Sequence, residues 1–126
     1  MKPRRVCATA WILYHGRQVL IVCGSDEVFI LGTSWRWRAA DREDLPPEMK
    51  PLFRYTAECK PVNGGRHILF ASSSDGVALV ERATGRVKSY ATVPNAHSAE
   101  LLPHGHIVVA SSNRGVAGDS PSLVAL

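Results

Sequence analysis

A gapless internal repeat is the feature that most constrains the fold of this chain. The stretch HILFASSSDG at 67–76 aligns with HIVVASSNRG at 106–115, an offset of 39 residues. An earlier stretch, LIVCGSDEVFIL at 20–31, aligns with LFASSSDGVALV at 69–80, an offset of 49 residues. In each copy an apolar run ends in small residues and a polar turn. Repeats at intervals of about 40–50 residues in β-rich sequence are typical of propeller blades, so the pattern predicts an all-β fold.

The second copy supplies the four strands of one blade. We expect these strands at 58–62, 68–72, 77–81 and 87–93. The last of them alternates apolar and polar residues with the period of two that is typical of a half-buried strand. Thr84 and Gly85, between the last two strands, suit a tight hairpin turn.

The flanking copies predict two further units of the same kind. The first has strands at 19–23, 27–31 and 35–39, with 6–14 as its inner strand, and the third has strands at 97–102, 107–111 and 122–126. We therefore expect one domain over 1–126, with units at about 6–40, 58–93 and 97–126 and an inserted loop at 41–57. This is a partial β-propeller of about two and a half four-stranded antiparallel blades.

The inserted loop carries the one helical turn that we expect. Three prolines, Pro46, Pro47 and Pro51, exclude a ladder strand there. Because proline is tolerated at the start of a helix, the sequence predicts a short helical turn near 47–53 and no other helix.

Composition limits the class of protein and its partners. The chain has 126 residues, 45% of them apolar and 21% charged, which is typical of a single soluble globular domain. The net charge of +4 is scattered, whereas nucleic-acid binding requires a basic patch, so a nucleic-acid partner is disfavoured. No segment approaches the roughly 20 apolar residues of a membrane-spanning helix.

The cysteines and the N-terminus bear on the cellular compartment. Cys7, Cys23 and Cys59 form neither a Cys-x-x-Cys pair nor an even set, and the first two lie in apolar runs, where free thiols are common. The segment Met1–Tyr14 imitates a signal peptide with its basic head and apolar run, but it lacks an Ala-x-Ala cleavage site. We interpret 6–14 as a strand, which favours the cytoplasm by default; export is the alternative if Met1–Tyr14 is a degenerate signal peptide.

Three stretches carry a family resemblance: HSAELLPHGHIVVASS at 97–112, ECKPVNGG at 58–65 and CGSDEVFILGTSWRWRAAD at 23–41. With them the chain resembles a family of uncharacterised bacterial β-propeller proteins, a domain of unknown function similar to quinoprotein-like and WD40-like propellers. The resemblance covers 18–126 and implies a longer protein, from exported or carbohydrate-related contexts. Because a closed propeller has about 4–8 blades, we expect a partial copy that either lacks its remaining blades or self-associates.

The inner strands carry the candidate binding residues, Glu58, Lys60, His97 and Glu100. In a propeller the loop that enters each inner strand lies at the mouth of the central channel. His97 directly follows such a loop, and the offset of 39 gives Glu58 the same position, so both are expected near that mouth. These residues either contact a ligand or bond neighbouring blades together, because a buried charge needs a partner.

Two other histidine-containing patterns support neither a catalytic site nor a metal site. His97 and Ser98 are adjacent on a strand and point to opposite faces, so they do not form a nucleophile and its base. His104 and His106 flank the turn glycine Gly105 without a third ligand, whereas zinc requires three or four. We therefore predict no metal and no cofactor.

The stretch SWRWR at 34–38 interleaves aromatic and basic residues. Trp35 and Trp37 share one face of a strand, and Arg36 and Arg38 share the other. Such residues can stack on bases or sugars. The preferred interpretation is that the tryptophans cover the flank of the adjacent blade and the arginines lie in water.

These observations favour a non-catalytic binding or scaffold module. Its ligand is expected to be a small polar molecule, a glycan or a protein at the channel mouth. The alternative is a propeller enzyme, a lyase or hydrolase acting on a sugar derivative, that uses the inner-strand His, Glu and Lys residues. The fold does not decide between a binding module and an enzyme, so the contacts of these residues must distinguish the two.

Overall fold

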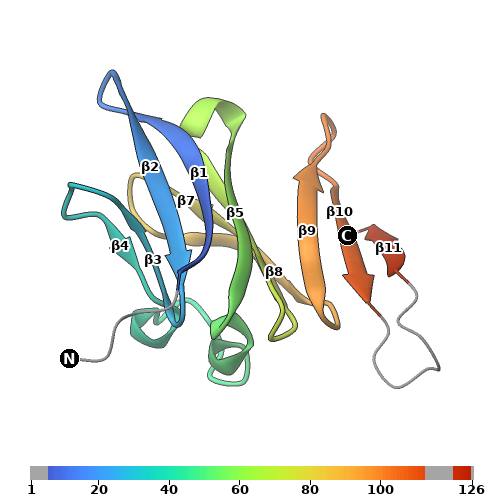
Figure 1. Cartoon of the computed structure of the whole chain (residues 1–126). Helices are drawn as coiled ribbons and strands as arrows, with labels where there is room; N and C mark the ends of the chain where they lie inside the picture. The colour runs from blue at the N-terminus through green and yellow to red at the C-terminus, as the bar shows by residue number, and fades with distance from the viewer. Residues whose placement is uncertain (1–5, 113–120, 126) are drawn as a thin grey trace.

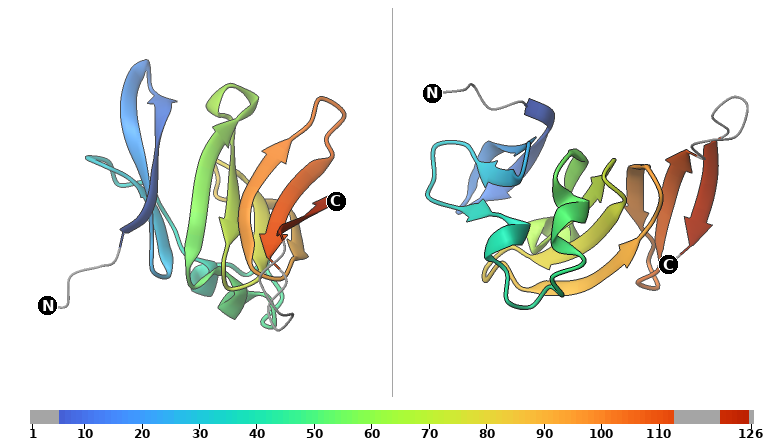
Figure 2. Two further views of the ribbon diagram at one scale, coloured as in Figure 1. Left: turned by 45° about the vertical axis from the view of Figure 1, so that its right-hand side comes forward. Right: turned by 90° about the horizontal axis from the view of Figure 1, so that it is seen from below.

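The computed structural model describes residues 6–112 and 121–125, which form three antiparallel sheets standing side by side (Figures 1 and 2). The first sheet contains β1 (Val6–Tyr14), β2 (Arg17–Gly24), β3 (Glu27–Ile30) and β4 (Arg36–Trp37). The second contains β5 (Thr56–Val62), β6 (His67–Ser72), β7 (Gly76–Glu81) and β8 (Val87–Thr92). The third contains β9 (Ala96–Leu101), β10 (Ile107–Ser112) and β11 (Pro121–Ala125). The prediction of an all-β fold is confirmed.

The strands lie where the apolar periodicity places them, and most ends differ by one or two residues. The segment 6–14 is indeed a strand, paired with β2 along its length. The shortest strand is β4, which was expected at 35–39 and spans only Arg36–Trp37. A 3-10 turn at Ala39–Asp41 then leads the chain out of the sheet.

In the described ranges 6–112 and 121–125, helical structure is limited to single 3-10 turns. One of them, Lys50–Phe53, confirms the helical turn predicted near 47–53. The turns at Ala39–Asp41 and Asn63–Gly65 were not predicted. Asn63, Gly64 and Gly65 all have positive φ, which explains why the β5–β6 connection uses two glycines. Among the described residues, no helix is long and apolar enough to cross a membrane.

Two cores separate the three sheets. The core between the first and second sheets is aromatic, with the Trp37 ring 4.9 Å from Phe70 and 5.8 Å from Phe53. The inserted loop runs below the first and second sheets (Figure 1). Its residues Leu45, Met49 and Phe53 are buried members of this core. The core between the second and third sheets is built from smaller side chains. Its buried members are Leu69, Ala71, Val77, Leu79, Val93, Ala96, Ala99, Ile107 and Val109.

A disulfide joins Cys23 on β2 to Cys59 on β5, with the two Cα atoms 6.2 Å apart. The expectation of a free thiol at Cys23 is therefore wrong. The bond links neighbouring sheets across 36 residues of sequence, so no local motif reveals it. Both cysteines are buried in the first core. The Cys7 side chain lies outside the described residues.

Candidate functional site

Three of the four candidate residues meet at the junction of β5 and β9. The Lys60 ammonium lies 2.5 Å from a Glu100 carboxylate oxygen and 3.2 Å from a Glu58 oxygen. The other oxygen of Glu58 accepts a hydrogen bond of 2.9 Å from the backbone amide of Ala99. We call Glu58, Lys60 and Glu100 the Lys60 cluster, and it bonds the second sheet to the third.

Strand alternation explains why these residues meet. Glu58 and Lys60 are two residues apart on β5 and share one face, while Cys59 between them points toward the first sheet. Lys60 pairs in register with Leu69, and Glu100 pairs with Val108. Since Leu69 and Val108 are themselves repeat equivalents, Lys60 and Glu100 hold the same position on adjacent inner strands.

The sequence expectation that Glu58 is the counterpart of His97 is wrong by one residue. The connection from β9 to β10 is one residue shorter than the connection from β5 to β6, so the inner strands align at an offset of 40, not 39. The counterpart of His97 is therefore Ala57. Each of these two residues is the extra residue of a β-bulge at the start of its strand, and the first sheet has a bulge at the same place in β1.

His97 lies on this bulge and is exposed. Its Nε2 atom is 3.4 Å from the side-chain amide nitrogen of Asn95. Asn95 has a φ of 47°, and its backbone amide donates a 2.7 Å hydrogen bond to the carboxylate of Asp75. The loop that precedes His97 is thus held to the turn between β6 and β7. The Lys60 cluster is formed by the other three candidate residues, Glu58, Lys60 and Glu100.

The electrostatics of the Lys60 cluster favour a charged lysine. Burial opposes the charge, but the hydrogen bonds and charges of Glu100 and Glu58 outweigh burial and raise the pKa of Lys60 above its ordinary value. A protonated lysine does not act as a base or a nucleophile at neutral pH. The Glu100 side chain remains 67% exposed, so it keeps acceptor capacity toward the solvent.

The described residues contain no group of three or more His, Cys, Asp or Glu side chains placed to hold a metal ion. His104 and His106 are both exposed next to the β9–β10 turn. Ser98 follows His97 directly on β9, and its register partner is Ala110.

The tryptophans of the first sheet bind the second sheet by their indole nitrogens. Trp35 Nε1 donates to the backbone oxygen of Arg82 at 2.7 Å, and Trp37 Nε1 donates to that of Gly85 at 3.0 Å. Both acceptors belong to the connection between β7 and β8. The tryptophan part of the packing interpretation is confirmed, because both indole groups are engaged by the neighbouring sheet. Arg36 is not simply in water, since it pairs with the buried carboxylate of Glu27.

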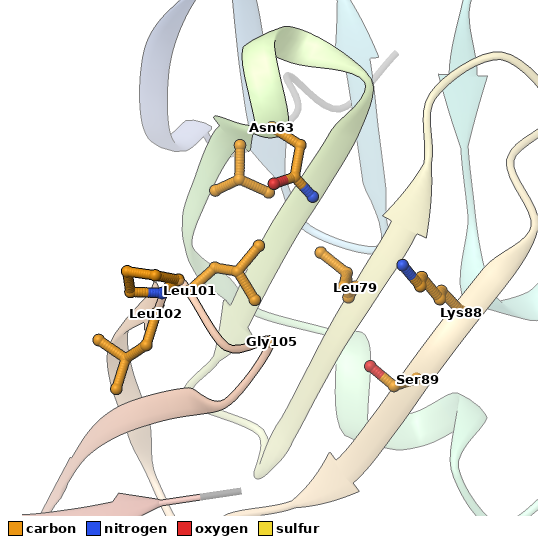
Figure 3. Close-up of a pocket in the computed structure, with 9 residues that line it drawn as sticks. Asn63, Leu79, Lys88, Ser89, Leu101, Leu102 and Gly105 are labelled. Carbon is orange, nitrogen blue, oxygen red and sulfur yellow. The ribbon is translucent and has the colours of Figure 1, made fainter.

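A groove between the second and third sheets was not foreseen from the sequence (Figure 3). It has a volume of about 610 Å³, and a hollow of about 270 Å³ shares Ser89 and Gly105 with it. Its signal in the sequence was weak: β8 exposes Lys88, Ser89 and Tyr90 in succession. The lining residues are Val62, Asn63, Leu79, Lys88, Ser89, Leu101, Leu102, Pro103 and Gly105. Within the described part of the chain, no candidate residue of the inner strands lines this groove.

Comparison with known proteins adds the family and the architecture. A family model described as a family of unknown function, DUF6528, matches residues 3–119. The chain belongs to the DUF6528 family. No curated protein matched this DUF6528 chain.

One solved structure similar to this DUF6528 chain is the crystal structure of the WD40 β-propeller domain of Doa1. The two share 13% sequence identity with a TM-score of 0.54, over 96% of this chain and 40% of that chain. At this identity the likeness shows the fold alone, and it confirms the prediction of a partial propeller. The chain spans less than half of the propeller that it matches.

Proposed function

We propose that this DUF6528 chain is a non-catalytic binding or scaffold module of the β-propeller type. Its ligand is a small polar molecule, a glycan or a protein, which meets the inner strands at the mouth of the channel. The observation that supports this proposal is the Lys60 cluster: the Lys60 ammonium is shared by carboxylates from two sheets. These charges fasten the inner strands together.

The bonds of the cluster leave little capacity for catalysis. Glu58 uses one oxygen for Lys60 and the other for the Ala99 amide. The raised pKa of Lys60 keeps that side chain cationic. Glu100 and His97 are exposed, so we assign ligand contact to these two side chains. No observation on the described residues favours the lyase or hydrolase alternative.

We also propose that 1–126 form one domain whose outer sheets are covered by further blades or by a second copy. The apolar residues Trp11 and Leu31 on the outer face of the first sheet are 63% and 54% exposed. In the second sheet, the position of Leu31 is held by Val80, which is fully buried against the first sheet. The outer face of the first sheet is therefore built like a face that receives another sheet. Mass measurement in solution distinguishes a monomer from a self-associated form.

The disulfide supports an oxidising compartment as the site of folding. Disulfides persist in secreted and periplasmic proteins and are rare in the cytosol. We propose that this chain folds outside the cytoplasm, with β1 retained as part of the first sheet. Thiol titration of protein purified from its native source tests this: oxidised Cys23 and Cys59 are expected, and two free thiols contradict it.

A turnover assay combined with variants tests the non-catalytic role. The wild-type chain, incubated with a panel of chromogenic glycosides and uronic-acid polysaccharides, is expected to release no product. Glu48→Gln, which removes an exposed carboxylate from the inserted loop, is the matched control for Glu100→Gln. Turnover that is lost in Glu100→Gln and retained in Glu48→Gln, at equal thermal stability, would establish the enzyme alternative instead.

A further inference from the structure

The groove between the second and third sheets combines an apolar wall with one cation. Leu79 on β7 and Leu101 on β9 face it from the two sheets, and Leu102 closes it from the β9–β10 turn (Figure 3). Its volume of about 610 Å³ lies in the range of about 300–1,000 Å³ that is typical of small-molecule sites. An apolar ligand portion therefore has both space and contacts here.

The cation is Lys88, whose ammonium group points toward the groove in Figure 3. Within the described part of the chain, Lys88 makes no ion pair and no side-chain hydrogen bond. The carboxylate of Glu81, on the neighbouring strand, is already engaged by Thr84 and Arg86. Among the residues that the structure describes, no Asp or Glu lines the groove, so none of them compensates the charge of Lys88 there.

Neutral hydrogen-bonding groups accompany this cation. The Ser89 hydroxyl and the Asn63 amide lie on opposite sides of the groove (Figure 3). Burial is the main cause of the lowered pKa of His67 beside Asn63, and the charges of Lys88 and Arg66 lower this pKa further against the opposing effect of Glu81. The two cations give this rim of the groove a positive character. An anionic ligand head is favoured over a cationic one.

We propose that this groove binds an aliphatic carboxylate of medium chain length, with the carboxylate on Lys88 and the chain along Leu79, Leu101 and Leu102. The carboxylate supplies a negative charge for Lys88, and the methylene groups replace water on Leu101 and Leu102, while the buried Leu79 forms the floor of the groove. The site shares no residue with the Lys60 cluster or His97. It is thus a second binding site, beyond the channel-mouth ligand of the proposed function.

Titration of the whole chain with octanoate, followed by calorimetry, tests this proposal. Saturable one-to-one binding is expected, and hexanoate should bind more weakly by about fourfold for each methylene removed. Lys88→Gln is expected to weaken octanoate binding by about tenfold, because a charge-assisted hydrogen bond is lost. Lys50→Gln, a lysine substitution outside the groove, is the matched control and should leave binding unchanged.

Three outcomes would overturn the proposal. Binding of octanol as tight as that of octanoate would mean that the groove does not recognise the charge. Equal affinity of Lys88→Gln and wild type would remove Lys88 from the site. Absence of saturable octanoate binding would mean that another occupant, such as a further sheet or a second copy, fills the groove. Circular dichroism confirms that each variant is folded. Failure here leaves the turnover assay on Glu100 unaffected, so the two proposals fail separately.

Discussion

The two interfaces between the three sheets differ in how they hold together. The interface of the first and second sheets is apolar and contains aromatic rings, with Trp37 packed on Phe70 and a disulfide between Cys23 and Cys59. The interface of the second and third sheets uses smaller side chains such as Ala71 and Ala99, and an ionic cluster at its inner edge.

The two interfaces also differ in how completely other parts of the chain cover them. The inserted loop packs tightly under the first interface: a side chain at Gly76 would place its Cβ atom 2.6 Å from the backbone oxygen of Leu52. The second interface opens into the groove beside Lys88. The comparison teaches that one interface of a repeat fold can be built for stability while the next one, made from the same strand pattern, presents polar groups and space to a ligand.

Removing a ring from the first interface should give the largest effect. Phe70 is fully buried between Trp37 and the disulfide-linked strands, so Phe70→Ala is expected to lower the free energy of unfolding by about 4 kcal/mol. Leu69→Ala, the adjacent residue that faces the second interface, is expected to cost about 3 kcal/mol. Urea unfolding measures both. A larger loss for Leu69→Ala would reverse the comparison.

The disulfide should contribute almost as much. The bond closes a loop across 36 residues of sequence. For this length, the entropy lost by the unfolded chain predicts a stabilisation of about 4 kcal/mol, which is an upper value because it assumes that the native bond introduces no strain. The double variant Cys23→Ala, Cys59→Ala is expected to unfold at a lower temperature than the oxidised wild type. Dithiothreitol should lower the wild-type melting temperature and leave that of the double variant unchanged. If dithiothreitol leaves the wild-type melting temperature unchanged, the disulfide does not stabilise the first interface.

The ionic cluster of the second interface should contribute little. The double-mutant cycle of Lys60→Met and Glu100→Gln is expected to give a coupling free energy of about 0.5 kcal/mol, because Glu100 is exposed to solvent. The pKa of Lys60 is raised in the folded state, so its stabilisation is present below the unfolded pKa of about 10.4 and is lost as the pH rises through the folded pKa. Urea unfolding of wild type and Lys60→Met should therefore converge at strongly alkaline pH. A stability gap that persists there would show that packing, not charge, carries the effect.

The smallest effect concerns the rim of the groove. The charge of Lys88 contributes to the lowered pKa of His67, after burial. Lys88→Gln is expected to raise the pKa of His67, as followed by proton NMR of its imidazole signals. If the pKa of His67 does not change, Lys88 lies too far from this rim of the groove to contact the carboxylate of the proposed ligand.

Periodicity made the strands predictable, since apolar alternation and turn residues act locally. The same reasoning placed Glu58, Lys60 and Glu100 on inner strands. It did not foresee the disulfide, because Cys23 and Cys59 belong to different units and their approach depends on how two sheets stack. The groove was missed for the same reason: Leu79 and Leu101 come together through packing of separate sheets.

The shortened connection between β9 and β10 has a consequence for engineering. It shifts the inner strand by one residue relative to the strand beside it, and this shift sets Lys60 level with Glu100. A chimera that exchanges units should therefore be joined in the loop before each inner strand, so that the strand travels together with its own hairpin. A junction made inside the hairpin would transplant a strand without the spacing that aligns its charges, and would bring together side chains that had never been neighbours.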